Sequence, residues 1–371
     1  MSRESKNYHV PENLQGSQMA AALRLLVGDL SWNAARKMIE HRQVQVNGNL
    51  CVDPARKLKT GDVIKVWTHP LSRPADERDV KLIFVDDDIV VVHKPAGVTT
   101  LRHPEERTWP TDRKQLQPTL DELARRVLAK YLDWPMPEDT SRGERPPRRP
   151  YTMREEHARR DRKRAAKGHD DSGLPPLYAV HRLDRDTSGL IVFARTHEAE
   201  TALIRIFRKH TIDRSYLAVV HGLPKSQTVK SHLVRDRGDG LRGSTTLRPL
   251  PDDAQHAVTH IKPLKRIGDL SLVECRLETG RTHQIRIHLS ELGHMLCGEG
   301  TYTHPAGKPA TKDTSGAPRQ ALHATELGFV HPITGEKLHF RAPLPDDLRK
   351  WLLTKVESGS PSTAKERPSE E

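Results

Sequence analysis

A ten-residue stretch, HRLDRDTSGL at residues 181–190, concentrates side chains that can act as acids, bases or nucleophiles. It places one imidazole, two guanidiniums and two carboxylates within six consecutive residues. The apolar, β-branched run at residues 190–194 follows and predicts a buried strand. A charged turn at the mouth of a core strand is where loops often carry function. The alternative is a solvated turn whose Asp and Thr side chains bond nearby backbone amides, and the stretch alone leaves both open.

A second dense stretch, TGRTHQIRIH at residues 279–288, predicts a helix with a polar beginning. Ile285, Leu289 and Leu292 recur at helical spacing. The first turn would carry four side chains suited to an anion at a helix N-terminus: Arg281, His283, Gln284 and Arg286.

Neither a metal site nor a nucleotide site is predicted. The histidines at positions 283, 288 and 294 do not have the spacing of a zinc-binding helix. Between Gly300 and Gly307 the chain has more residues than a phosphate-binding loop allows, and Pro309 follows Lys308 where Ser or Thr is required. We therefore expect no metal and no cofactor.

The bulk composition points to a polyanionic partner. The net charge is +12 and the pI is near 9.6, and Lys and Arg gain free energy by neutralising phosphates. An anionic membrane surface is the competing partner, but the sequence has no apolar run of about 18 residues and no signal-peptide pattern. The three cysteines, without metal-ligand spacing, fit a reducing compartment. We expect a cytoplasmic protein without membrane association.

The N-terminal part predicts two short helices and a hairpin. Apolar residues from Met19 onward have helical spacing, and Ser31 stands at the N-cap of a second helix. The Asn47-Gly48 pair predicts a hairpin turn, and residues 63–67 predict a strand. This order resembles the small RNA-binding domain first known from a ribosomal small-subunit protein. The resemblance implies that Arg36, Lys37, His41 and Arg42 contact RNA; the alternative is a generic module with a solvated basic face.

The rest of the chain predicts a strand-rich domain with one long interruption. Residues 81–85 and 89–93 predict two strands that end in the turn KPAG, whose Lys94 would close a cleft or only cap the sheet. Further strands are expected at residues 214–222 and 270–277, and residues 225–257 are expected to be hairpins or loops. Within the interruption, Thr119 to Glu122 form a capping box for one helix. Beyond residue 135 the composition predicts disorder, and the basic run at 159–164 fits an RNA-contacting arm or a solvated segment equally well.

Four segments in fixed order, KPAG, HRLDRDTSGL, RSYLAVVHG and TGRTHQIRIH, resemble the RluA-type pseudouridine synthases. The resemblance implies an α+β fold: a large mixed, mainly antiparallel sheet with flanking helices and a central cleft, plus the small N-terminal α+β domain. The implied division is a flexible tail (1–15), the RNA-binding domain (16–69), a linker (70–79), the catalytic domain (80–103 and 177–354), a partly disordered basic insertion (104–176) and a disordered tail (355–371).

The resemblance also implies roles for individual residues. Asp184 would be the catalytic aspartate, Arg286 the cation that pairs with it, and Tyr216 the ring that stacks on the target uracil. Without the resemblance, Tyr216 fits an ordinary core aromatic in an alternating strand. Arg182 would take the place of the flipped base, and we expect Arg281, His283 and Gln284 to bind RNA.

The chemistry has independent reasons for these residue types. A carboxylate can attack the sugar or base, or take a sugar proton, and a nearby guanidinium keeps it charged when it is buried. The family usually has Gly-Asp where this chain has Gly298-Glu299, which keeps the acid one carbon longer. The predicted function is a monomeric RNA pseudouridine synthase acting on ribosomal RNA or tRNA. The alternative is a non-catalytic RNA-binding or ribosome-assembly factor on the same fold.

Overall fold

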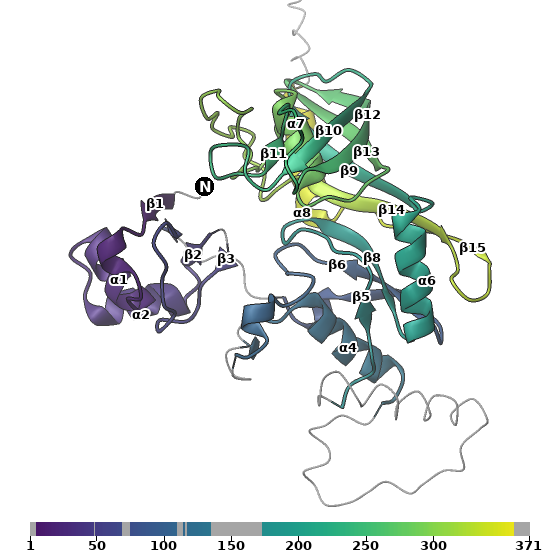
Figure 1. Cartoon of the computed structure of the whole chain (residues 1–371), viewed down its shortest axis with the longest axis horizontal. Coiled ribbons are helices and arrows are strands. Elements are labelled where there is room, and N and C mark those ends of the chain that lie inside the picture. The colour runs from purple at the N-terminus through teal and green to yellow at the C-terminus, as the bar shows by residue number, and fades with distance from the viewer. Residues whose placement is uncertain are drawn as a thin grey trace, which may run out of the picture. The chain divides into compact units, whose positions relative to one another are not determined.

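The computed structural model describes residues 5–47, 49–68, 75–109, 114–115, 117–134 and 173–359 (Figure 1). The chain forms two compact units. One comprises Met1–Ala75 and Arg102–Pro118, and the other comprises Asp76–Leu101 and Thr119–Glu371. Among the described helices, none has the length and apolar character needed to cross a membrane.

The first unit packs two helices on a small sheet. Helices α1 (Met19–Val27) and α2 (Trp32–Glu40) share a core with the sheet, in which Leu23, Ile39 and Ile64 are fully buried. The Ser31 hydroxyl accepts a hydrogen bond from the Ala34 amide, as expected of an N-cap. The sheet order is β1 (Ser5–His9), β4 (Val63–Trp67), β2 (Val44–Val46) and β3 (Asn49–Leu50), all antiparallel.

The prediction of a flexible tail up to residue 15 is wrong for residues 5–15. β1 pairs with β4 along its whole length, and the 3₁₀ helix η1 (Glu12–Leu14) follows it. Val10 and Leu14 are buried in the core of the unit. The sequence hid this strand because an edge strand with mostly exposed side chains has no apolar alternation to detect.

The second unit is built on one mixed sheet of eleven strands (Figure 1). Among its described strand pairs, only β14 and β8 run parallel to each other, and the others are antiparallel. The main path, in spatial order, is β11 (Gly243–Ser244), β10 (Gln227–Val234), β12 (Gln255–Ile267), β13 (Leu270–Leu277), β9 (Asp213–His221), β14 (Leu322–Val330), β8 (Ser188–Ala194), β6 (Ile89–Lys94) and β5 (Lys81–Val85). Two strands branch from it: β15 (Lys337–Arg341) pairs with β14, and β7 (Tyr178–Ala179) pairs with β8.

Helices cover this sheet and complete its cores. Helix α6 (His197–Arg208) buries Ala199 and Leu203 in one core with residues of β6, β8 and β14. Helix α7 (Gln284–Glu291) contributes Ile287 to another core, and α8 (Asp346–Gly359) contributes Leu348 and Trp351 to a third. Helix α4 (Leu120–Tyr131) begins with the predicted capping box. The fold class is therefore the predicted one, α+β with a large mixed sheet.

Residues 225–257 hold hairpins, one of the two forms that the sequence predicted: β10 pairs antiparallel with β11 and with the start of β12. Two other expectations are corrected or fall outside the described residues. Helix α8 continues to Gly359, beyond the start predicted for the C-terminal tail. The linker from 70 ends in the 3₁₀ helix η2 (Glu77–Asp79), while the basic run at 159–164 and the tail from 360 lie outside the described residues. The domain boundaries remain predictions.

Gly189 is the position where the parallel pair of strands tolerates no side chain. Its φ is +123°, and a Cβ atom there would lie 2.2 Å from the Ala324 carbonyl oxygen of β14.

We expect Gly189→Ala to lower the free energy of unfolding by at least about 3 kcal/mol, because the backbone of β14 must move. Denaturant unfolding measures this. Gly300→Ala is the matched control, since nothing lies within 4 Å of its added Cβ, and equal losses in both variants would contradict the argument.

Candidate active site

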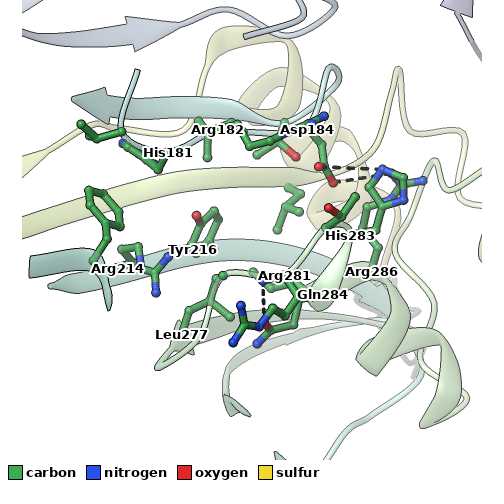
Figure 2. Close-up of a pocket in the computed structure, with 18 of the residues that line it drawn as sticks. His181, Arg182, Asp184, Arg214, Tyr216, Leu277, Arg281, His283, Gln284 and Arg286 are labelled. Carbon is green, nitrogen blue, oxygen red and sulfur yellow. Dashed lines mark hydrogen bonds and ion pairs between the residues drawn. The ribbon is translucent and has the colours of Figure 1, made fainter. Parts of the chain in front are cut away.

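A pocket of about 420 Å³ lies in the second unit, where the two dense sequence stretches meet (Figure 2). The loop before β8 forms one wall, and the loop from β13 into α7 forms another. The end of α6 and strand β9 complete it. All sequence-predicted site residues of this unit line the pocket: Arg182, Asp184, Tyr216, Arg281, His283, Gln284 and Arg286.

Asp184 lies in the loop between β7 and β8 and faces two groups from the α7 region. Its Oδ2 is 3.5 Å from Nη1 of Arg286, and its Oδ1 is 3.9 Å from Nε2 of His283. The Asp184 side chain is only 15% exposed, so this carboxylate is partly desolvated beside a fixed cation. A carboxylate placed in this way can act as a nucleophile or as a base on a group that enters the pocket.

Arg286 is held more tightly by Glu299 than by Asp184. Its Nε and Nη2 donate to the two Glu299 oxygens, each at 2.8 Å, and its guanidinium lies 5.0 Å from the centre of the Tyr302 ring. Burial alone would raise the pKa of the Glu299 carboxyl, but the charge and hydrogen bonds of Arg286 outweigh burial and lower it. Glu299 therefore fixes the fork of Arg286 with its third nitrogen, Nη1, toward Asp184.

His283 is a neutral neighbour of the carboxylate. Its backbone is left-handed, with φ of +59°, which turns the chain immediately before α7. Burial lowers the pKa of His283 to about 4, despite the opposing effect of Asp184. Its Nδ1 is 2.8 Å from the Tyr302 hydroxyl, whose pKa burial raises to about 12. This hydrogen bond holds the imidazole in place, with Nε2 on the side of Asp184.

Tyr216 belongs to β9 and lies between the two ends of the pocket in Figure 2. It is 8% exposed, and burial raises the pKa of its hydroxyl, so the ring is uncharged. Asp184 and Arg286 are at one end of the view and Arg214 is at the other. An aromatic ring in this place offers a flat base a stacking surface within reach of the carboxylate.

The Asp184 loop is braced by two cations that line no part of the pocket. Lys94 is fully buried and donates to the carbonyl oxygens of Arg185 and Thr187, at 2.8 and 2.7 Å. Burial lowers its pKa to about 7, against the opposing effects of Asp186 and Asp184. Arg319 donates to the Asp186 carbonyl at 3.2 Å and to the Ser188 hydroxyl at 3.0 Å. The lysine of the KPAG turn therefore braces the loop, a role that the sequence left open.

Comparison with known proteins matches both units. Residues 88–291 match the RNA pseudouridylate synthase family, and residues 28–64 match the S4 domain. The chain belongs to the RNA pseudouridylate synthase family.

Curated relatives and a solved structure agree with this family. The ribosomal large subunit pseudouridine synthase D of Neisseria meningitidis serogroup A is 32% identical over 366 residues, covering 95% of this chain and 83% of that protein. The uncharacterized RNA pseudouridine synthase YlyB of Bacillus subtilis is 34% identical, covering 87% and 89%. A structure of human RNA pseudouridylate synthase domain containing 4 matches with a TM-score of 0.50 and 20% identity, covering 74% of this chain and 92% of that one, which supports the fold. The predicted enzyme class is confirmed, and the non-catalytic alternative is not favoured.

Gln284 of this pseudouridine synthase lines the pocket, but its hydrogen bonds differ from the role predicted for it. It is 2% exposed, and its Oε1 accepts from the Thr279 hydroxyl and the Arg281 amide, at 2.8 and 3.0 Å. Its Nε2 donates to the Val258 carbonyl and the Thr259 hydroxyl, both at 2.9 Å. A contact with RNA would break these bonds, so we assign Gln284 to holding the loop before α7 and withdraw it as an RNA ligand.

The other predicted RNA ligands of the synthase are accessible to solvent. Arg182 is exposed at the pocket, and Arg281 is half-buried, with Nε donating to the His256 carbonyl at 3.0 Å. In the S4 unit, Arg36 and Lys37 are exposed on α2, opposite its buried Ala35 side. Arg42 follows the helix with φ of +62° and is half-buried.

Three side chains of the described part of the synthase have metal-ligand spacing: Asp86, Asp88 and His331. The tautomer of His331 argues against a metal there. Its Nδ1 accepts from the amides of Ile333 and Thr334, at 3.3 and 3.0 Å, so the imidazole proton must be on Nε2. Nε2, which lies 3.0 Å from the Asp86 carboxylate, then carries the proton and has no lone pair for an ion.

Buried neutral histidines should make the synthase labile to acid. Burial lowers the pKa of His181 to about 3 and those of His288 and His323 to about 4. The unfolded chain takes up protons at these histidines below about pH 6.5, whereas the folded chain does so only near pH 4 and below. Stability is therefore full above about pH 6.5 and falls as the pH drops toward 4, by up to about 4 kcal/mol per pH unit for the three groups.

Denaturant unfolding at a series of pH values measures this slope. His288→Gln should remove about one proton from the slope, because the buried His288 imidazole is one of the three that stay neutral in the folded chain. A slope that is equally steep in the His288 variant would contradict the assignment.

Proposed function

We propose that this synthase isomerises uridines in the RNA of the large ribosomal subunit, with Asp184 as the catalytic carboxylate. The observation that carries the proposal is the placement of Asp184 in a pocket beside the fixed cation Arg286 and the buried ring of Tyr216. The choice of RNA follows the names of the curated relatives.

The reaction breaks the bond from the sugar C1′ to N1 of uracil and forms one from C1′ to C5. C5 loses a proton and N1 gains one, so the reaction has no net oxidation, reduction or release of a group. It therefore requires no cofactor. Asp184 attacks the sugar or the base, or removes a sugar proton. The cation Arg286 offsets the negative charge that remains near Asp184 during these steps. Tyr216 stacks on the detached uracil and holds it while the ring turns.

The target uridine must leave its stack before it can enter the pocket. Extruding a base costs a few kcal/mol, and Arg182, exposed at the pocket, is placed to fill the vacated position and offset part of that cost. Arg281 and His283 would contact the RNA around the uridine, and Arg36, Lys37 and Arg42 of the S4 unit would bind RNA phosphates.

We extend the proposal to the organisation of the chain. The unit that contains β1 to β4 would form the RNA-binding domain, and the unit built on the eleven-stranded sheet would form the catalytic domain. We also expect the active form to be a monomer. An RNA of the ribosome as substrate supports a cytoplasmic location.

A map of pseudouridines tests the proposed substrate. Large-subunit RNA from cells with and without this protein is compared by chemical mapping at single-nucleotide resolution. We expect one or a few uridines to lose modification without the protein and to regain it when purified protein is added to the RNA. An unchanged large-subunit map, with losses in tRNA only, would overturn the choice of RNA, while an unchanged map in all RNA would overturn catalysis.

A further inference from the structure

The pocket has far more positive charge than its carboxylate needs. Five arginines line it, whereas Asp184 is the one carboxylate among its lining residues. Arg286 is neutralised by Glu299, and Arg182 lies beside Asp184 in the sequence. The remaining arginines that line it are Arg208, Arg214 and Arg281.

Arg214 is the most deeply buried of these three. It is 9% exposed on β9, and a guanidinium has five N–H donors. One acceptor engages them in the described part of the chain, the Glu278 carbonyl at 3.1 Å from Nη2, and Nε is buried without a partner. No carboxylate of the described residues lies within ion-pair distance of it. A buried, unpaired charge costs several kcal/mol, so this side chain is arranged for a partner that comes from outside.

The surroundings of Arg214 orient its guanidinium and add a second cation. The Phe207 ring lies 5.6 Å from the guanidinium carbon, and the Gly280 backbone packs against Nη1, because a Cβ on Gly280 would lie 2.5 Å from that atom. Burial lowers the pKa of Arg214, and the neighbouring charge of Arg281 lowers it further. Two like charges held together in a pocket favour an anion between them.

We propose that Arg214, together with Arg281, binds a backbone phosphate next to the target uridine. This inference rests on the proposed function, since it assumes that a nucleotide enters the pocket. The guanidinium fork matches two phosphate oxygens, and two neighbouring cations match the charge of a phosphate better than a neutral uracil carbonyl. The ring of Tyr216 lies between Arg214 and Asp184 in Figure 2, so a base stacked on it leaves the Arg214 end for the adjoining phosphate.

Binding measurements in the Asp184→Asn background test the phosphate directly, because they do not depend on catalysis. The probe is large-subunit RNA, and the dissociation constant is measured over a range of KCl concentrations. Adding Arg214→Gln should weaken binding by about tenfold. It should also reduce the slope of log Kd against log salt by about one, because one phosphate contact is lost. Arg276→Gln is the matched control: this exposed arginine on β13 pairs with Glu274 and does not line the pocket, so the slope should stay unchanged.

Two more variants and a small probe separate phosphate binding from a structural role. Gly280→Ala keeps every charge but displaces the Arg214 guanidinium, and should raise KM more than it lowers kcat. Arg214→Lys keeps the charge without the fork and should restore the salt slope but only part of the affinity. Calorimetry compares uridine with uridine 3′- or 5′-monophosphate. The monophosphate should bind the intact protein more tightly than uridine does, whereas Arg214→Gln should bind the two equally well.

The outcomes are distinguishable. A lower affinity with an unchanged salt slope, and equal binding of uridine and both monophosphates in the intact protein, would overturn the phosphate subsite and assign Arg214 to the base. A lower melting temperature with unchanged affinity and slope would overturn it in favour of a structural role. Failure of the proposed function gives a different result: either the intact protein forms no pseudouridine in large-subunit RNA, or Asp184→Asn still forms it, whatever Arg214 does.

Discussion

Replacing Asp184 with Asn should reduce pseudouridine formation by at least about 10³-fold while RNA affinity changes by less than about threefold. Asparagine keeps the shape of the side chain but provides neither a nucleophile nor a base. The loop that carries it is held through backbone carbonyls by Lys94 and Arg319, so the substitution leaves the loop in place. RNA contacts come from arginines elsewhere in the pocket and in the S4 unit.

The measurement is conversion of uridine in large-subunit RNA under single-turnover conditions, with binding measured separately. Asp186→Asn is the matched control, because Asp186 is in the same loop, two residues on, and does not line the pocket. We expect that control to retain most activity. Retained modification in the Asp184 variant, or an equal loss in both, would remove Asp184 from its assigned role.

Replacing Arg286 with Met should damage both stability and catalysis. Glu299 would remain buried without its cation, which typically costs about 3–5 kcal/mol of unfolding free energy. The pocket would also lose the cation that lies 3.5 Å from Asp184 and offsets negative charge at the reacting groups, so the reaction rate should fall by at least about 10²-fold.

The double variant Arg286→Met, Glu299→Gln separates these two effects. The glutamine introduced there would no longer carry a buried charge, and its amide oxygen can still accept from the amides of Thr301 and Tyr302 that now bond Glu299. Denaturant unfolding should show that most of the lost stability returns, while single-turnover rates stay low. If stability and rate both recovered in the double variant, Arg286 would support only the fold. If neither recovered, the buried charge of Glu299 would not be the source of the lost stability.

The parts of the fold that the sequence predicted well are those encoded by local patterns. The N-cap at Ser31, the capping box at Thr119 and the apolar run in β8 depend on neighbouring residues, and the structure has each of them. Strand β1 was missed because its side chains are largely exposed. Its position depends on pairing with the distant strand β4, which no short window contains.

The candidate site divides in the same way. Residue type and family resemblance suggested Asp184, Tyr216 and Arg286, and the fold brings all three to one pocket. Asp184 was predicted as the partner of Arg286, but its second partner, Glu299, was noted only as an acid that departs from the family pattern. Gln284 was misassigned because a polar side chain at the start of a helix resembles a ligand. Only the folded chain shows that β12 provides acceptors for its amide.

The braces on the Asp184 loop have a consequence for synthesis of the protein on the ribosome. Lys94 precedes its partner Arg185 by 91 residues in the sequence, and Arg319 follows its partner Ser188 by 131 residues. The loop is therefore held by one segment that is translated early and by another that is translated late. A nascent chain emerges from its N-terminus and carries a complete S4 unit long before Arg319 has been translated. We therefore expect the growing chain to be able to bind RNA before it can modify it, with catalytic competence beginning only at the end of translation.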